Sequence, residues 1–156
     1  MPDWNTRPAT PADVEPVAEL RALVLRPDLE RLGRYDPHRV RRRLREGFTP
    51  HHTRIIEVDG ALAGCAALRP APDAHHLEHF YLAPHLHGRG IGTAVLRTLL
   101  RECDDQGRTV RLNVLQGSPA RRLYERHGFT LDTEDAVDVF LVRPPRAPGP
   151  TAAMGT

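Results

Sequence analysis

The sequence predicts one α/β domain, an α+β mixed sheet with helices packed on its faces. Three observations lead to this fold class. Segments with strand and helix patterns alternate along the chain. The strand–helix–strand passage over residues 75–115 is too long for a hairpin, so it implies a parallel step in the middle of the sheet. A chain of 156 residues can bury a core without disulfides, and we expect the domain to span residues 1–143.

The N-terminal third is expected to form a short strand and two helices. Residues 4–7 have a strand pattern, and Thr10 followed by Pro11 is typical of a helix start. Pro27 should end that helix, because proline lacks the amide that a helix interior needs. Asp36 then caps a second helix. The polar face of this second helix carries Arg39, Arg41, Arg42, Arg43 and Arg45. They form either a solvated face or a surface for an anionic substrate or partner.

The middle of the chain is expected to supply the centre of the sheet. Residues 53–58 and 61–68 are two apolar runs joined by Asp59-Gly60, which is typical of a hairpin. A strand over residues 75–82 follows, then a glycine-rich turn, a helix and another strand over residues 109–115. The two later strands are therefore the parallel neighbours of the sheet.

The C-terminal part is expected to hold one more helix and the last strands. Ser118 and Pro119 are typical of a helix start, and Gly128 is placed to end that helix in a left-handed conformation. Residues 129–143 hold a final strand or two. Residues 144–156 are rich in proline, alanine and glycine, so we expect them to form a disordered tail.

Composition narrows the classes of function. The net charge is +2, and every basic residue counted among the 22 Lys and Arg positions is an arginine, which fits the coding bias of a bacterial-like genome. No aromatic residues interleave with the helix arginines, so nucleic-acid binding is not expected. No long apolar run predicts a membrane span. Cys65 and Cys103 are isolated and set among apolar residues, which predicts free thiols in the cytoplasm. Five histidines between residues 75 and 87 share no one-face spacing, so no metal site is expected.

The glycine-rich turn after the strand over residues 75–82 is the strongest functional signal. Glycines at 88, 90 and 92 clear side chains from the turn, and a helix begins there. Backbone amides of such a turn and of a helix N-terminus suit a phosphate or pyrophosphate. The pattern lacks the lysine of a P-loop and the glycine order of a dinucleotide fingerprint.

Two motifs resemble the GNAT superfamily of N-acetyltransferases. The first, HGRGIG at residues 87–92, is similar to the family's acyl-CoA pyrophosphate loop, with His87 where the family has Gln or Arg. The second comprises NVLQGSPA at residues 113–120 and LYERHGF at residues 123–129, with Ser118 in a place that Asn often holds. The resemblance covers residues 5–143 and implies the GNAT fold.

The resemblance implies that acetyl-CoA, the acyl donor, lies between the two central parallel strands where they splay apart. Backbone groups of Phe80 and Leu82 would pair with the pantetheine arm, and Ser118 would bond the same arm. Amides of the glycine turn would hold the pyrophosphate, with Arg89 adding charge. The cofactor-binding residues implied are Phe80, Leu82, His87, Gly88, Arg89, Gly90, Ile91, Gly92, Thr93 and Ser118.

The same resemblance implies direct attack of a neutral primary amine on the thioester, so a base must remove a proton from the ammonium. Strand alternation places His76, Glu78, Phe80 and Leu82 on one face of the strand. Glu78 is our first candidate for the base and His76 the second. Tyr124 matches the family's tyrosine that protonates the departing thiolate, although a core tyrosine would fit the same helix stripe.

The acceptor is not identified by these motifs. A small amine, a polyamine, an antibiotic, a protein N-terminus or a lysine side chain all fit, and the acidic run Glu134, Asp135 and Asp138 would favour a cationic acceptor if it faced the cleft. The alternative function is an acyl-CoA-binding sensor or partner-binding module without catalysis. A homodimer is possible in this family, but no residue pattern indicates one.

Overall fold

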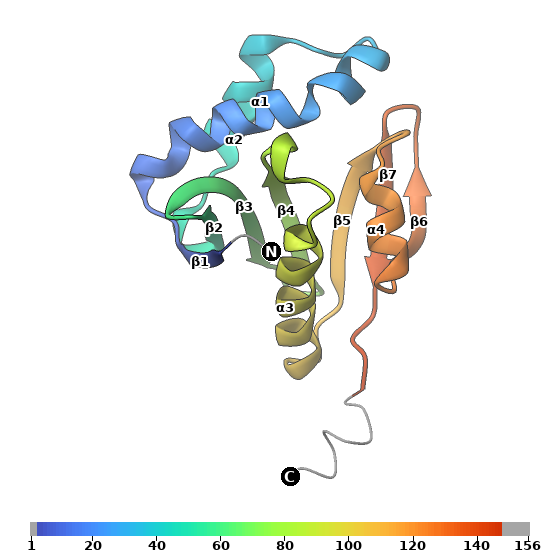
Figure 1. The fold of residues 1–156 in the computed structure, drawn as a ribbon. Helices are drawn as coiled ribbons and strands as arrows, with labels where there is room; N and C mark the ends of the chain where they lie inside the picture. The colour runs from blue at the N-terminus through green and yellow to red at the C-terminus, as the bar shows by residue number, and fades with distance from the viewer. Residues whose placement is uncertain (1–2, 148–156) are drawn as a thin grey trace.

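The computed structural model describes residues 3–147 and contains one mixed sheet with helices on both faces (Figure 1). Its strands run in the order β1-β2-β3-β4-β5-β7-β6. The strands are β1 (Trp4–Pro8), β2 (Thr53–Val58), β3 (Ala61–Pro70), β4 (His75–Leu82), β5 (Val110–Leu115), β6 (Thr130–Glu134) and β7 (Asp138–Arg143). The helices are α1 (Val14–Arg31), α2 (Pro37–Gly47), α3 (Ile91–Asp105) and α4 (Ala120–Arg126), with short 3₁₀ turns η1 (Pro11–Asp13), η2 (Pro50–His52) and η3 (Pro84–Leu86). The expected mixed sheet is confirmed.

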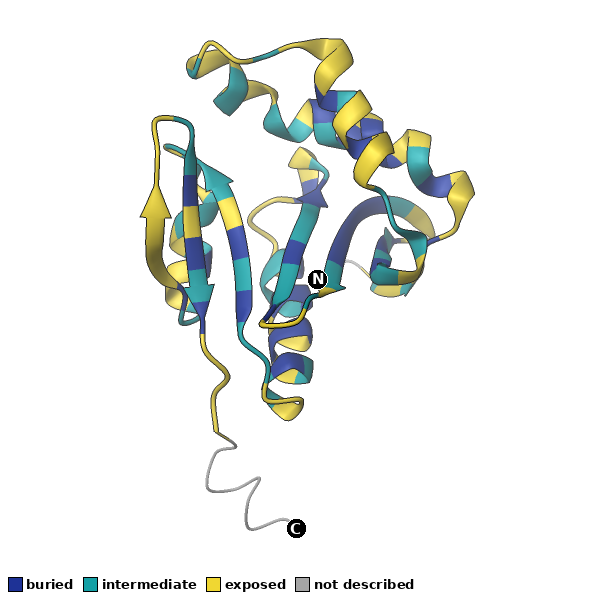
Figure 2. Cartoon of the chain, turned by 180° about the vertical axis from the view of Figure 1, so that it is seen from behind, coloured by how far each residue is buried: buried dark blue, intermediate teal, exposed yellow. Residues whose placement is uncertain are grey.

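Two apolar clusters hold the helices to opposite faces of the sheet. The larger contains Val95, Leu96 and Leu99 of α3 together with Tyr124 of α4. The smaller joins Val17 and other residues of α1 and α2 to β2, β3 and β4. Figure 1 shows α3 and α4 in front of the strands, with α1 and α2 across the end of the sheet at which β4 and β5 finish. Figure 2 shows the buried residues along the strands that these helices cover.

The parallel step lies between β4 and β5, as expected, but the two strands pair only at their beginnings. His75 is paired with Val110 and His76 with Arg111, whereas β4 continues to Leu82 and β5 to Leu115. The strands therefore separate toward their carboxyl ends (Figure 1). This separation leaves edge amides and carbonyls of both strands available to a ligand.

A bulge in β4 overturns the expected alternation of its side chains. His79 has a φ of +47°, and the pairing with β3 shifts there, so that Cys65 pairs with Tyr81 but Ala67 with Glu78. One extra residue in β4 reverses the faces on either side of it. Phe80 and Leu82 consequently pack with Leu77 against α3 and do not share a face with Glu78, as plain alternation predicted.

Pro27 does not end the first helix, and our expectation was wrong. α1 continues through Pro27 to Arg31. Proline removes the bond to the carbonyl four residues earlier, here that of Leu23. Leu23 lies on the exposed side of α1, with 57% of its surface accessible, so water can replace the lost donor. The consequence is that the α1–α2 connection is shorter than expected.

Three other local signals are confirmed. Asp36 caps α2 by accepting from the amides of His38 and Arg39, at 2.9 Å and 3.0 Å. Asp59 and Gly60 both have positive φ, as the hairpin turn requires. Gly128 follows α4 with a φ of +94°.

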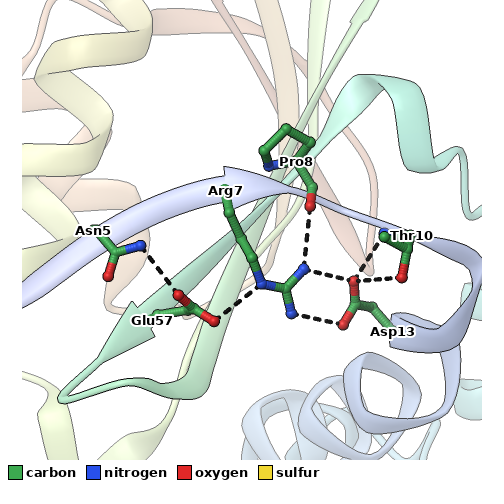
Figure 3. Close-up of polar contacts among 6 residues, drawn as sticks. All are labelled: Asn5, Arg7, Pro8, Thr10, Asp13 and Glu57. Atoms are coloured by element: carbon green, nitrogen blue, oxygen red, sulfur yellow. Dashed lines mark hydrogen bonds and ion pairs between the residues drawn. The ribbon is translucent and has the colours of Figure 1, made fainter.

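A polar network ties β1, β2 and the start of α1 together (Figure 3). Arg7 donates through both terminal nitrogens to the Asp13 carboxylate at 2.9 Å and through Nε to Glu57 at 3.0 Å. The amide of Thr10 donates to Asp13 at 2.8 Å, and Asn5 donates to Glu57 at 3.1 Å. We call these five residues the N-terminal network. Paired with Arg7, the buried Asp13 has its pKa lowered to about 2.

The expected tail lies partly outside the described residues, because residues 148–156 are not described. Residues 144–147 have no regular structure, and the amide of Arg146 donates to Asp104 at 2.9 Å. Over residues 3–147 we find no helix with the length and apolarity that a membrane crossing demands.

Candidate active site

A cavity of about 1370 Å³ runs through the gap between β4 and β5. Its walls include β4 from Leu77 to Leu82, β5 from Leu112 to Leu115, the turn before α3, the start of α4, and α1 and α2. It therefore reaches from the face covered by α3 to the end covered by α1 and α2. This volume exceeds that of a drug-sized pocket, roughly 300–1,000 Å³, and leaves space for two ligands side by side.

The glycine turn forms an open cradle in this cavity, which fits the phosphate part of acetyl-CoA. Gly88 and Gly90 have φ values of +77° and +82°, and Gly90 precedes the first turn of α3. A Cβ built on Gly88, Gly90 or Gly92 would meet no atom within 4 Å, so the space above the turn is empty of protein. The first amide of α3 with a backbone partner is that of Ala94, bonded to Gly90. Within residues 3–147 the amides of Gly92 and Thr93 are thus unpaired donors of a helix N-terminus in the cavity wall.

The other residues expected to bind the cofactor have different surroundings. His87 Nε2 donates to the carbonyl of Leu82 at 2.7 Å, so its ring fixes the turn to the end of β4. Ile91 is fully buried in the core, its backbone included, and is not part of the cavity wall. Arg89 is exposed and is not part of the cavity wall, whereas Thr93 and Ser118 are. Ser118 Oγ accepts from the amide of Ala120 at 3.2 Å.

Both sequence candidates for the base line a small second pocket, but only Glu78 also lines the cavity. Glu78 lines the cavity and accepts two hydrogen bonds from Arg69 at one oxygen, the shorter 2.8 Å long. His76 lines a separate, smaller pocket with residues such as Arg111 and Asp132. The structure therefore brings Glu78, but not His76, to the cavity that holds the glycine cradle.

The cavity wall contains another candidate base, His79, which the sequence analysis did not identify. Its Nδ1 lies 3.2 Å from the Tyr81 hydroxyl, which also accepts from Arg21 Nε at 3.0 Å. Arg21 can only donate, so the Tyr81 oxygen accepts from it, while the direction of the Tyr81–His79 hydrogen bond depends on the His79 tautomer. When neutral His79 carries its hydrogen on Nδ1 and donates to Tyr81, its Nε2 is free to act as a base. Burial, and secondarily the charge of Arg21, lower the pKa of His79, while burial raises the pKa of Tyr81 to about 12. The bulge lets His79 line the same cavity as Glu78, whereas strict alternation places these two residues on opposite faces.

Tyr124 is 6% exposed and lines the cavity from α4. Its ring packs edge-on against Phe129, with centroids 5.5 Å apart. Over residues 3–147 no hydrogen bond to its hydroxyl is recorded, although that hydroxyl is not sealed from the cavity. Burial raises the pKa of Tyr124, so it stays protonated at neutral pH. A protonated phenol facing a cavity can donate a proton to a nearby anion.

Neither cysteine is placed for nucleophilic chemistry. Cys65 and Cys103 are both free and buried, and burial raises their pKa values to about 12 and about 11. A thiol with so high a pKa remains uncharged near neutral pH and is a poor nucleophile. The described residues contain no cluster of three or more side chains suited to a metal ion.

Comparison with known proteins places these features in one family. Residues 17–129 match the family described as the acetyltransferase (GNAT) family. No curated protein matches the sequence. Among solved structures, a PaiA N-acetyltransferase from Thermoplasma acidophilum, crystallised with coenzyme A, superposes with a TM-score of 0.74 at 19% identity, covering 91% of this chain and 99% of the other.

Two further structures share the fold. An N-acetyltransferase from Staphylococcus aureus Mu50 has a TM-score of 0.67 at 20% identity, with 88% of this chain and 99% of the other covered. The N-acetylglutamate synthase of Neisseria gonorrhoeae, complexed with coenzyme A and N-acetyl-glutamate, has a TM-score of 0.64 at 20% identity. That alignment covers 94% of this chain and 36% of the synthase.

Proposed function

The chain belongs to the GNAT family of acetyltransferases, and we propose that it transfers the acetyl group of acetyl-CoA directly to a primary amine. The observation that carries the proposal is the open glycine cradle at the end of β4, facing a cavity that passes through the β4–β5 gap. The cradle would hold the pyrophosphate of acetyl-CoA through the amides of residues 88–93. The free edges of β4 at Phe80 and Leu82 would pair with the pantetheine arm, beside Ser118.

The reaction needs a proton acceptor, because an ammonium cannot attack a thioester. Two groups in the cavity wall can take this proton: Glu78, held by Arg69, and His79, kept neutral by burial. His76 faces the other pocket, so we no longer propose it as the base. The neutral amine then forms a C–N bond to the thioester carbon, and a β4 amide near Leu82 stabilises the oxyanion.

The leaving group requires a proton donor. When the C–S bond breaks, the thiolate takes a proton from Tyr124, whose raised pKa keeps it protonated beforehand. The attacking nitrogen then loses its second proton, which restores the phenol of Tyr124, so one proton of the ammonium ends on the base and one on CoA. The products are free CoA and an N-acetylated amine. The free, buried thiols of Cys65 and Cys103 favour a reducing compartment, and we propose the cytoplasm as the site of action.

The test is thermal melting with and without acetyl-CoA in the wild type, Gly90→Trp and Gly60→Trp. Gly60 has the same φ of +82° and the same open surroundings, but lies in the β2–β3 turn, so it controls for backbone strain. A ligand at 100 times its Kd stabilises the native state by about 2.7 kcal/mol. We expect the melting temperature of the wild type and Gly60→Trp to rise by about 5–10 °C, and that of Gly90→Trp to stay constant.

Release of CoA is then followed with a panel of amines. Release that depends on the amine supports transfer. A melting shift without CoA release for any amine would instead favour the acyl-CoA sensor. No melting shift at millimolar acetyl-CoA in the wild type would overturn the proposed donor.

A further inference from the structure

Carboxylates and guanidiniums in the cavity wall differ in their partners. Asp28 is paired with Arg31 and Glu78 with Arg69, while Asp36 caps α2. Asp135 accepts from the amides of Val137 and Asp138, and Asp138 accepts from Asn113. All five carboxylates that line the cavity thus accept hydrogen bonds from the protein. The acidic turn does reach the cavity, where Asp135 and Asp138 accept only from neutral amides and keep their charge.

Four of the five α2 arginines form two pairs, each with a spacing of one helical turn. Arg41 and Arg45 point to α1, where Glu19 and Glu15 hold them through two hydrogen bonds each. Arg39 and Arg43 line the cavity instead. Within residues 3–147 neither of their guanidiniums has a hydrogen bond or an ion pair. The described carboxylates thus neutralise one side of this helix and leave the cavity side charged.

Arg21 adds a half-buried cation to the same wall. Its Nε donates to Tyr81 and its Nη1 to the carbonyl of Val40, but no described carboxylate pairs with it. Its Nη2 has no recorded partner in the described part of the chain and is not sealed from the cavity. A partly buried guanidinium without a counter-ion costs free energy, which an anionic ligand would offset.

The unpaired arginines and the glycine cradle belong to helices on opposite faces of the sheet. Arg39, Arg43 and Gly47 follow one another at intervals of four residues, so they share one ridge of α2. At the end of this ridge, a Cβ on Gly47 would lie 3.4 Å from His79 Nε2. α2 packs on the face of the sheet opposite to the one that α3 covers, and the glycine cradle lies at the start of α3. The positive ridge thus leads to a candidate base and not to the pyrophosphate.

We infer that the amine acceptor is a small amino-carboxylic acid, whose carboxylate is bound by Arg39 and Arg43 while its amine points toward His79 and Glu78. This inference rests on the proposed acetyl transfer. Guanidinium–carboxylate hydrogen bonds are charge-assisted and bidentate, so they discriminate a carboxylate from its neutral amide. Loss of one such contact typically weakens binding about tenfold or more.

The experiment measures CoA release and acceptor binding for matched amines. The probes are the common amino acids, γ-aminobutyrate, the carboxamide of each, and 1,4-diaminobutane, with acetyl-CoA saturating. Binding is measured separately by calorimetry in the presence of CoA. The variants are Arg39→Gln, Arg43→Gln and their combination. Arg42→Gln is the matched control, since Arg42 is on the same helix, is 60% exposed and is only 3.9 Å from Glu46.

We expect at least one carboxylated amine to react with a kcat/KM about tenfold or more above that of its amide. Arg39→Gln and Arg43→Gln should each raise its KM about tenfold. They should change neither the turnover of the amide nor the affinity for CoA, and Arg42→Gln should behave as the wild type.

The remaining outcomes separate this inference from the proposed function. If CoA release is faster with amides or with 1,4-diaminobutane, the inferred carboxylate-binding site is contradicted, while the proposed acetyl transfer is supported. Loss of CoA affinity in Arg39→Gln and Arg43→Gln would also overturn it, by assigning these arginines to the donor. If an amino acid binds in a way that depends on Arg39 and Arg43 but no CoA is released, the carboxylate-binding site is supported and the proposed acetyl transfer is contradicted. Neither binding nor release with any probe would overturn both.

Discussion

The N-terminal network and the cavity wall both depend on arginine, yet they use it in opposite ways. In the N-terminal network, Arg7 gives four hydrogen bonds to Asp13, Glu57 and the carbonyl of Pro8 (Figure 3). In the cavity wall, the guanidiniums of Arg39 and Arg43 have no hydrogen bond or ion pair with another described residue. The first set is satisfied within the fold, and the second keeps its hydrogen-bonding capacity for a ligand.

This difference predicts that substitutions in the N-terminal network change the free energy of unfolding, whereas substitutions in the cavity wall change binding or catalysis. Polar groups satisfied inside the fold contribute to the free energy of unfolding. Polar groups left open toward a cavity contribute to binding or catalysis, and removing them costs the fold little. Substitutions in the two regions should therefore separate stability from activity.

Tyr124→Phe should have the largest effect on kcat, and it tests whether an unpaired polar group of the cavity wall acts in catalysis. Removing a general acid lowers kcat by about 10²–10⁴-fold, and we expect about 10³-fold. The ring and its contact with Phe129 remain, and the hydroxyl has no recorded partner among the described residues, so the melting temperature should change little. Single-turnover kinetics with acetyl-CoA would measure the loss. An unchanged kcat together with a lower melting temperature would mark Tyr124 as a core residue only.

His79→Asn should lower kcat/KM by about 100-fold at pH 7, because it removes a candidate general base. His79 combines the features of both regions, since it is hydrogen-bonded within the fold and also lines the cavity. Asparagine tolerates the positive φ at this bulge. Since the pKa of His79 is lowered, the neutral base persists below pH 6.5, and activity should fall only as the pH drops through that lowered pKa.

The matched control for this prediction is Glu78→Gln, measured over the same pH range. If His79 is the base, the acidic limb of the kcat/KM profile disappears in His79→Asn and remains in Glu78→Gln. The opposite result would assign the proton to Glu78.

Asp13→Asn should have the smallest effect, and it tests whether the N-terminal network contributes to the free energy of unfolding. The pKa of Asp13 is lowered from 3.8 to about 2, so its ionised form stabilises the fold by about 2 kcal/mol. That stability is fully present above pH 3.8 and is lost as the pH falls toward 2. Urea unfolding should show the variant about 2 kcal/mol less stable at pH 7, with kcat/KM unchanged.

As a control, Asp59→Asn changes an exposed turn residue whose positive φ asparagine also tolerates. It should unfold as the wild type does. A gap between Asp13→Asn and the wild type that stays constant down to pH 2 would contradict the assignment of this stability to the Asp13 carboxylate.

The sequence alone predicted the features that have a local physical cause. Asp36 caps the helix that begins next to it, and the left-handed positions at Gly60, Gly90 and Gly128 follow from glycine's lack of a side chain. The order of elements and the parallel step followed from periodicity and connection length. The glycine turn, a backbone feature, therefore gave the family and the proposed donor site.

The tertiary structure decided what depends on distant partners. The bulge at His79 arises from the pairing of β4 with β3, and it determines which face Phe80 and Leu82 occupy. The partners of the α2 arginines depend on where α1 places Glu15 and Glu19. The period of a strand or helix determines the direction in which a side chain points. It does not determine which residues that side chain contacts, because residues distant in the sequence are brought together only by tertiary packing.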